Sequence, residues 1–275
     1  MTVLVIGATG KTGRPVVEAL TARGVDVRAA SRNPGANGVG FDWVDRDTWQ
    51  PVLDGVEGLY LVPPYAVPDG AGLVRDLLAA APGVRRVVLL SLLGVDLMPD
   101  AIPMAAWEDE VRSSGKDWTI LRPNWFQQNF GEGFAPALRE GGTLELPAAD
   151  ATVAFVDTRD IADVAAAALT ERGHTRKVYV LTGPRALSHA EALHLLGEAA
   201  DRKLTYTALD PGAFADGMRK AGADDRSVRW QQGLFTLIRD GENAVVTDTV
   251  ERVTGHPARR LESYAQENAP IWRYQ

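Results

Sequence analysis

A glycine-rich segment near the start of the chain constrains the fold more than any other feature. Gly7-Ala-Thr-Gly10-Lys-Thr-Gly13 stands between a β-branched run at residues 3–6 and a segment, 14–23, whose apolar residues recur at helical spacing. In such a strand–loop–helix unit the first glycine permits a tight turn, the second lets the backbone approach an anionic ligand, and the third lets helix and strand pack closely. The N–H groups and positive dipole of the helix N-terminus favour phosphate. The segment therefore predicts a phosphate-binding βαβ unit.

Strand-like and helix-like runs continue to alternate along the chain. Strands are predicted at residues 25–30, 41–44, 58–62, 86–91, 119–122, 153–156 and 178–181, and helices at 69–81, 105–114, 160–169, 188–200, 211–221 and 225–239. Continuously apolar strands indicate a sheet that helices cover on both faces. The pattern predicts an α/β fold, a doubly wound parallel sheet (Rossmann fold) with a smaller C-terminal substrate lobe. We place the nucleotide-binding domain at 1–150 and the lobe mainly at 151–275, with 178–181 returning to the main sheet.

Charge and composition exclude several classes of protein. The 29 Lys and Arg against 36 Asp and Glu give a net charge of −7, which disfavours binding to nucleic acid or to an anionic membrane. The chain has no cysteine, and its four histidines form no His-x-x-x-His pair, so we expect no metal site and histidines that are caps or surface residues. No apolar run reaches the roughly 18 residues of a membrane span, and no leader-like pattern opens the chain. We expect a soluble, cytoplasmic protein.

The end of the second predicted strand indicates which dinucleotide the loop holds. A site for NAD(H) places Asp or Glu there, whereas this chain has Ser31-Arg32. A guanidinium pairs with the 2′-phosphate of NADP(H), which a carboxylate would repel, so we expect NADP(H); the alternative is that Arg32 is a solvated loop residue. Asp42, beside Trp43, either binds the adenine amino group or is a turn carboxylate. The expected cofactor contacts are Gly7, Thr9, Gly10, Lys11, Thr12, Gly13, Ser31, Arg32, Asp42, Trp43, Val62, Pro63 and Pro64.

The carboxyl ends of the predicted strands also carry the candidate substrate residues, because ligands of open α/β sheets bind there. Ser91 ends one strand, and its hydroxyl either binds nicotinamide or substrate or caps the next turn. Tyr65 and Phe126 follow two other strands and can enclose a flat substrate, although Phe126 also suits a core between lobes. Trp107 lies on a nearby helix, with a solvated helix face as the alternative. We predict Ser91 and Tyr65 as catalytic residues and Tyr65, Trp107, Asn124 and Phe126 as substrate contacts.

Several segments together carry a family resemblance over nearly all of the chain. They are Val5-Ile-Gly-Ala-Thr-Gly-Lys-Thr-Gly13, Ser31-Arg-Asn33, Phe41-Asp-Trp43, Leu61-Val-Pro-Pro64, Arg86-Val-Val-Leu-Leu-Ser91 and Thr119-Ile-Leu-Arg-Pro-Asn-Trp-Phe-Gln-Gln-Asn-Phe130. With them the chain resembles the NmrA-like atypical short-chain dehydrogenase/reductases, and among these the festuclavine/agroclavine dehydrogenase type. The resemblance implies an NADP(H)-binding Rossmann domain and a substrate cleft covered by the C-terminal lobe. The family includes alkaloid iminium reductases, quinone and dye reductases, and proteins that bind NADP(H) without turnover.

The proton relay of ordinary short-chain dehydrogenases is absent from the sequence. That relay is a Tyr with a Lys four residues later, and none of the six tyrosines has one. Many relatives keep a Lys or His at the start of the helix before strand 119–122, where the resemblance places Met104. Ketone reduction forms an alkoxide that needs a donor, whereas hydride simply neutralises an iminium ion, and water can protonate a reduced quinone.

We therefore expect an NADPH-dependent reductase of secondary metabolism that transfers hydride to an iminium, imine or quinone. The expected partner is a small planar organic substrate, neutral or cationic, rather than nucleic acid or membrane, and the protein is expected to be a monomer or homodimer. Two alternatives stay open: a non-catalytic NADP(H) sensor that regulates a partner protein, and a cyclase or isomerase that does not consume its cofactor.

Overall fold

Seven parallel strands form the central sheet, in the order β3-β2-β1-β4-β5-β6-β9. The computed structural model describes residues 1–65, 67, 70–97 and 104–273. The strands are β1 Thr2–Ile6, β2 Asp26–Ser31, β3 Val39–Gly40, β4 Gly58–Leu61, β5 Arg86–Leu90, β6 Asp117–Pro123 and β9 Lys177–Leu181. The strand order reverses between β1 and β4, which opens a crevice at their carboxyl ends. The predicted doubly wound Rossmann fold is confirmed.

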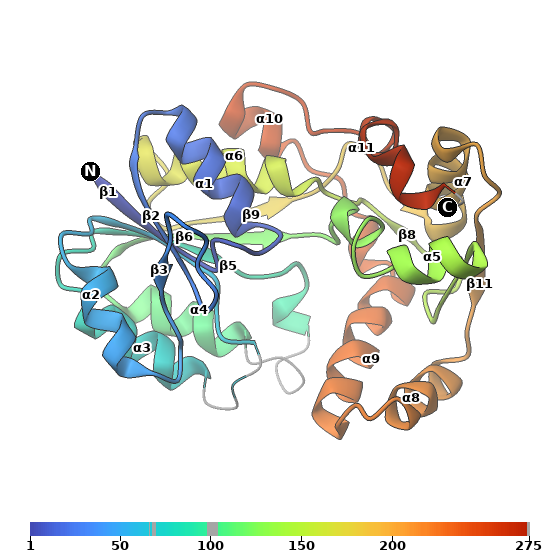
Figure 1. Cartoon of the computed structure of the whole chain (residues 1–275), viewed down its shortest axis with the longest axis horizontal. Helices are drawn as coiled ribbons and strands as arrows, with labels where there is room; N and C mark the ends of the chain where they lie inside the picture. Colours follow the sequence, from blue (N-terminus) through green and yellow to red (C-terminus); the bar gives the residue numbers. More distant parts are fainter. Residues whose placement is uncertain (66, 68–69, 98–103, 274–275) are drawn as a thin grey trace.

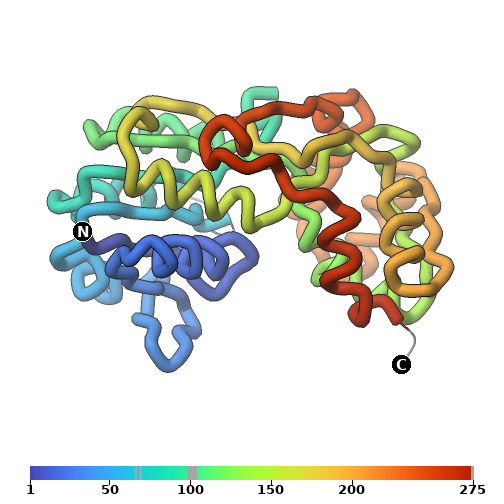
Figure 2. Tube along the Cα trace, turned by 90° about the horizontal axis from the view of Figure 1, so that it is seen from above, coloured from blue at the N-terminus to red at the C-terminus, as the bar shows by residue number. Residues whose placement is uncertain are grey.

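Helices cover both faces of this sheet because successive side chains of a strand point to opposite sides. Val3 and Val5 of β1 pack under α1 and α6, whereas Leu4 and Ile6 pack toward α2, α3 and α4. Figure 1 shows these two layers, and Figure 2 shows α1 (blue) and α6 (yellow) running side by side. The helices of the sheet layers are α1 Gly13–Ala22, α2 Trp49–Leu53, α3 Gly70–Ala80, α4 Met104–Ser113, α6 Thr158–Thr170 and α10 Thr249–Thr254.

A second lobe lies beyond the carboxyl ends of the strands (Figure 1). Its own core contains Phe130, Phe155, Leu193, Phe235 and Trp272, all nearly inaccessible to solvent. The lobe holds two small sheets, parallel β7–β11 and antiparallel β8–β10. Its elements are α5 Ala135–Gly141, β7 Thr143–Leu146, β8 Thr152–Val153, β10 Leu187–Ser188, α7 His189–Ala200, β11 Thr205–Ala208, α8 Pro211–Lys220, α9 Asp225–Arg239 and α11 Leu261–Asn268. Short 3₁₀ helices are η1 Arg46–Thr48, η2 Val95–Leu97, η3 Gln127–Asn129, η4 Glu242–Ala244 and η5 Ala269–Trp272.

The chain passes repeatedly between the main sheet and the second lobe. Segment 130–155 contributes to the core of the lobe, and α6 and β9 then pack on the main sheet. The chain enters the lobe again at β10, and α10 later returns to pack against α6 and β9. The predicted return of 178–181 to the sheet is confirmed, since β9 pairs with β6. The division of the chain after residue 150 stays a prediction.

Two of the predicted strands differ from the structure. Segment 41–44 lies outside the sheet, because the backbone N–H of Asp42 donates to Thr48 Oγ1 and its C=O accepts from Trp49 Nε1. These local bonds replace strand pairing, and only the two-residue β3 precedes them. Segment 153–156 is a strand at its first residue, where Val153 pairs with Leu187, and its last residue, Val156, forms an isolated parallel bridge with Phe126. Residue 69, the predicted start of α3, lies outside the described residues.

His189 corrects the expectation that the histidines are caps or surface residues. It begins α7, has no exposed surface, and stacks on Tyr206 with Phe155 at its edge. Neither ring nitrogen has a hydrogen-bond partner among the described residues. Burial lowers the pKa of His189 to about 4, because the charged form loses its hydration without gaining a partner.

His189 should make stability fall in acid. Its folded-state pKa lies below the unfolded value of 6.5, so the unfolded chain binds more protons between about pH 6.5 and about pH 4. Across that window the free energy of unfolding should drop by about 3 kcal/mol on account of this residue alone. Urea unfolding at several pH values should show a shallower acid loss for His189→Phe than for wild type. His194→Phe, an exposed change on the same helix, should keep the wild-type slope. If the free energy of unfolding fell equally with pH in His189→Phe and in wild type, the lowered pKa assigned to His189 would be contradicted.

Candidate functional site

The loop between β1 and α1 has the geometry that its glycines predict. Gly7 adopts a φ of +76°, and its N–H and that of Ala8 donate to Ala30 C=O at 2.9 and 3.0 Å. A Cβ on Gly13 would lie 2.1 Å from Gly7 O, so only glycine allows helix and loop this close. Thr12, the N-cap of α1, makes no side-chain cap bond, which leaves the helix N-terminus open to a ligand.

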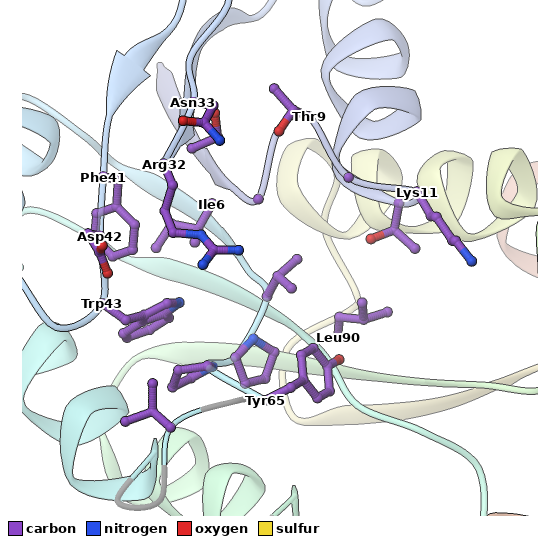
Figure 3. A pocket seen from close by; sticks show the side chains of 18 of the residues that line it. Ile6, Thr9, Lys11, Arg32, Asn33, Phe41, Asp42, Trp43, Tyr65 and Leu90 are labelled. Atoms are coloured by element: carbon purple, nitrogen blue, oxygen red, sulfur yellow. The ribbon is translucent and has the colours of Figure 1, made fainter. Parts of the chain in front are cut away.

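A cavity of about 540 Å³ lies against this loop at the carboxyl ends of the strands (Figure 3). We call it the cofactor cavity. Every predicted cofactor contact except Gly13 lines it, and Gly13 instead packs beneath the loop. The lining residues are Ile6, Gly7, Thr9, Gly10, Lys11, Thr12, Ser31, Arg32, Asn33, Phe41, Asp42, Trp43, Val62, Pro63, Pro64, Tyr65, Val67, Leu90 and Phe126. The structure thus brings the predicted residues together; that they bind a cofactor stays a prediction.

Ser31 and Arg32 present unused hydrogen-bonding groups to the cofactor cavity. The hydroxyl of Ser31 is buried and has no partner among the described residues. The guanidinium of Arg32 points into the cavity near Trp43 and forms no ion pair with any described residue (Figure 3). Asp42 also lines the cavity, but its Oδ1 accepts the N–H of Val44 at 3.1 Å, as in a turn.

Arg14 is a candidate that the sequence analysis missed. It lies in the first turn of α1 and lines a neighbouring hollow of about 240 Å³, which shares Thr9 and Ser31 with the cofactor cavity. Its position directly after the glycine loop could have identified it in the sequence, because a cation at a helix N-terminus adds to the attraction of that terminus for phosphate. Arg32 in the cofactor cavity and Arg14 in the neighbouring hollow thus both line a space that includes Ser31.

A second cavity, of about 500 Å³, lies between the sheet and the second lobe; we call it the substrate cavity. It meets the cofactor cavity at Lys11, Tyr65 and Phe126, which line both. Most of its wall is aromatic or aliphatic, and α9 supplies much of it. The lining residues are Lys11, Tyr65, Ser91, Leu92, Leu93, Met104, Pro123, Asn124, Trp125, Phe126, Asn129, Gly133, Phe134, Leu146, Phe214, Trp230, Gln231, Leu234, Phe235, Leu237 and Asn243.

Ser91 lies at the wall of the substrate cavity and is held by a buried carboxylate rather than by a turn. Its Oγ donates to Glu108 Oε1 at 2.5 Å, and Glu108 also accepts from Arg112 and Arg122. Glu108 and its neighbour Trp107 have no exposed surface, so the solvated helix face given as the alternative for Trp107 is wrong. With its proton directed at Glu108, the Ser91 hydroxyl offers the cavity only its lone pairs.

Two predicted substrate contacts have other partners. Trp107 has no exposed surface and lines neither cavity; its ring packs edge-to-face beneath Tyr65, with centroids 5.4 Å apart. The structure therefore does not bring Trp107 to either cavity, because the helix face that carries it faces the core, and its contact with substrate stays an untested prediction. Asn124 lines the substrate cavity, but its amide bonds to Asn243 in both directions and to the N–H of Trp125. It positions the wall of the cavity.

Asp160, Asp163 and His256 gather their ligand-type atoms within 4.8 Å of one another. Arg259 already bonds to both carboxylates, at 2.9 Å for Asp163, and its backbone N–H donates to Asp160. The cluster therefore ties the segment before α11 to α6 through ion pairs.

The described part of the chain contains no helix with the length and apolar composition of a membrane span.

Known proteins resemble the chain along its whole length. A Streptomyces griseus reductase of (4-alkanoyl-5-oxo-2,5-dihydrofuran-3-yl)methyl phosphate is 35% identical, over 97% of this chain and 98% of its own. The NAD(P)H azoreductase of Xenophilus azovorans is 33% identical over the same shares. The crystal structure of the Escherichia coli NADPH-dependent quinone oxidoreductase QOR2 with NADPH superposes with a TM-score of 0.82 at 28% identity, covering 97% of this chain and 99% of that one.

The predicted resemblance to clavine dehydrogenases is also confirmed, since agroclavine dehydrogenase of Claviceps purpurea is 29% identical over 99% of both chains. Residues 1–229 match the NmrA-like family, and this segment spans the glycine loop, the main sheet and most of the wall of the substrate cavity. The chain therefore belongs to the NmrA-like family.

Proposed function

We propose that this protein is an NADP(H)-dependent oxidoreductase that transfers hydride to a small planar acceptor such as a quinone, an iminium or an imine. The observation that carries the proposal is the meeting of two cavities at Lys11, Tyr65 and Phe126. One cavity follows a phosphate-binding loop and the other has aromatic walls, so a dinucleotide and a flat molecule can touch at their junction. Hydride transfer requires such contact.

The residues of the cofactor cavity fit NADP(H). The open N-terminus of α1 suits a pyrophosphate. The unpartnered Ser31 hydroxyl suits a 2′-phosphate, together with Arg32 of the same cavity and Arg14 of the hollow that shares Ser31. When bound, the cofactor supplies the hydride. Two of the relatives support the assignment, because one was crystallised with NADPH and another is an NAD(P)H azoreductase.

The chain's own residues position the acceptor and exclude water. Tyr65 and Phe126 line the junction, and α9 adds Trp230, whose ring packs edge-to-face on Tyr65 with centroids 6.4 Å apart, and Phe235. Ser91 can accept a hydrogen bond from the acceptor or the carboxamide of the cofactor. Asn124 and Glu108 hold this wall in place through buried hydrogen bonds.

The test is the loss of NADPH absorbance with a panel of acceptors: 1,4-naphthoquinone, a cyclic iminium salt and an azo dye. We expect oxidation with at least one acceptor and faster turnover with NADPH than with NADH. A reaction without acceptor provides the baseline. Tight cofactor binding with no oxidation across the panel would instead favour the non-catalytic sensor, and conversion of substrate without loss of NADPH would favour a cyclase or isomerase.

A further inference from the structure

The ammonium group of Lys11 is directed to the substrate side of the junction. Lys11 belongs to the glycine loop, yet its Nζ donates to Asn129 Oδ1 at 2.9 Å and lies 3.6 Å from Glu132 Oε2. Both partners follow β6, and Asn129 lines the substrate cavity. Figure 3 shows the side chain pointing away from Arg32 and Trp43. The charge of this loop lysine is thus held apart from the candidate 2′-phosphate site.

Lys11 is also the one ionised side chain among the described residues that line the substrate cavity. The other polar groups of that wall are neutral hydroxyls and amides, and the rest is aromatic or aliphatic. The side chain of Lys11 is 33% exposed, so water screens its charge only in part, and the apolar wall beside it strengthens the effect of the charge relative to open water. The cavity therefore favours a ligand that carries or develops negative charge close to Lys11.

We infer that Lys11 stabilises the negative charge that forms on the oxygen of a reduced carbonyl-type acceptor, and that it donates the proton to that oxygen. The inference rests on the proposed function and narrows its acceptor to a quinone or a conjugated enone. Such a substrate gains negative charge on oxygen during hydride transfer. An iminium ion, in contrast, approaches the site with a positive charge of its own and would be repelled by Lys11.

The atoms and electrons of this step balance. Hydride leaves the C–H bond of the reduced nicotinamide, which is thereby oxidised, and forms a C–H bond at the β-carbon of the enone or quinone. The C=C pair shifts to form the C=C bond of an enolate, and the C=O π pair moves onto the oxygen. That oxygen takes a proton from Nζ of Lys11, and water returns a proton to the amine. Lys11 and Glu132, with side chains 33% and 42% exposed, are both in reach of the water that returns this proton. Lys11 thus supplies the proton that a Tyr-x-x-x-Lys pair, absent here, would donate and that the apolar Met104 cannot.

Ligand binding tests the inference without turnover. Two flat probes of matched shape, 1-naphthoate and the neutral 1-naphthamide, are titrated into protein saturated with NADP⁺, and again without it, while tryptophan fluorescence is followed. Wild type should bind the anion roughly tenfold more tightly than the amide, as expected for one partly screened charge pair. Lys11→Met should lose this preference, and Lys11→Arg should retain most of it. Lys220→Met, an exposed change outside both cavities, should match wild type.

The same variants distinguish the inferred role of Lys11 from a rival role, in which Lys11 binds the pyrophosphate of the cofactor. In that case Lys11→Met would raise the Kd of NADP⁺ tenfold or more and leave the preference for 1-naphthoate unchanged, which overturns the inference. Equal affinity of wild type for both probes overturns it as well. Circular dichroism confirms that each variant is folded. Because the readout is binding, a failure of all acceptors in the oxidation assay would defeat the proposed function and leave this result interpretable.

Discussion

Gly13→Ala should abolish cofactor binding. The added Cβ would lie 2.1 Å from Gly7 O and 2.6 Å from Gly7 C, distances that only a shift of the backbone can relieve. Because Gly7 and Gly10 build the same turn, that shift moves the amides at the helix N-terminus. We expect the Kd of NADPH, followed by its fluorescence, to rise roughly a hundredfold or more, and the free energy of unfolding to fall by about 3 kcal/mol.

Gly217→Ala is the matched control for this change. Gly217 lies in α8 with no atom within 4 Å of its added Cβ, and its φ is not in the left-handed region. Alanine there should leave NADPH binding unchanged and raise stability by up to about 1 kcal/mol, because alanine favours helix. Wild-type affinity for NADPH in Gly13→Ala would contradict the role assigned to the loop.

Arg32→Asp should convert a preference for NADPH into indifference or a preference for NADH. The change removes the cation beside the Ser31 hydroxyl and adds a carboxylate that repels a 2′-phosphate. We expect a cost of about 3 kcal/mol in NADPH binding, or roughly a hundredfold in Kd. The Kd of NADH should change less than about threefold, since that ligand lacks the phosphate.

Titration of both cofactors into wild type, Arg32→Asp and Arg172→Asp measures this difference. Arg172 is exposed after α6 and lines neither cavity, so its substitution makes the same change of charge at a remote place. It should leave both Kd values near those of wild type. Equal weakening of NADPH and NADH by Arg32→Asp would show that Arg32 does not read the 2′-phosphate.

Local sequence signals predicted most of the main sheet, because its strands are apolar runs, and they also located one helix of the second lobe. The capping box of Ser188 and Glu191 marks the start of α7 as predicted. The errors came where distant or side-chain bonds replace strand pairing. Thr48 and Trp49 satisfy the backbone of Asp42, and no pattern within 41–44 reveals them.

The two halves of the candidate site differ in how far they could be predicted. The cofactor cavity is built mainly from one loop and from the carboxyl ends of parallel strands. Once the strands are predicted, the residues that follow them are expected at the same edge of the sheet. The substrate cavity also needs Trp230 and Phe235, which α9 brings back across the lobe from far along the chain. Likewise, Trp107 and Glu108 face the core because of how α4 packs on the sheet, and the helical pattern alone did not distinguish that face.

The return of β9 to the sheet limits how this protein can be recombined. Since α6 and β9 lie between the two portions of the lobe in the sequence, no single cut separates the second lobe from the main sheet. A chimera that replaces everything after one chosen residue with the same region of a relative would either replace the edge strand β9 or divide the core of the lobe between two sources. Changes of specificity in such an architecture therefore arise by substitution along α9 and the cavity wall rather than by the shuffling of modules.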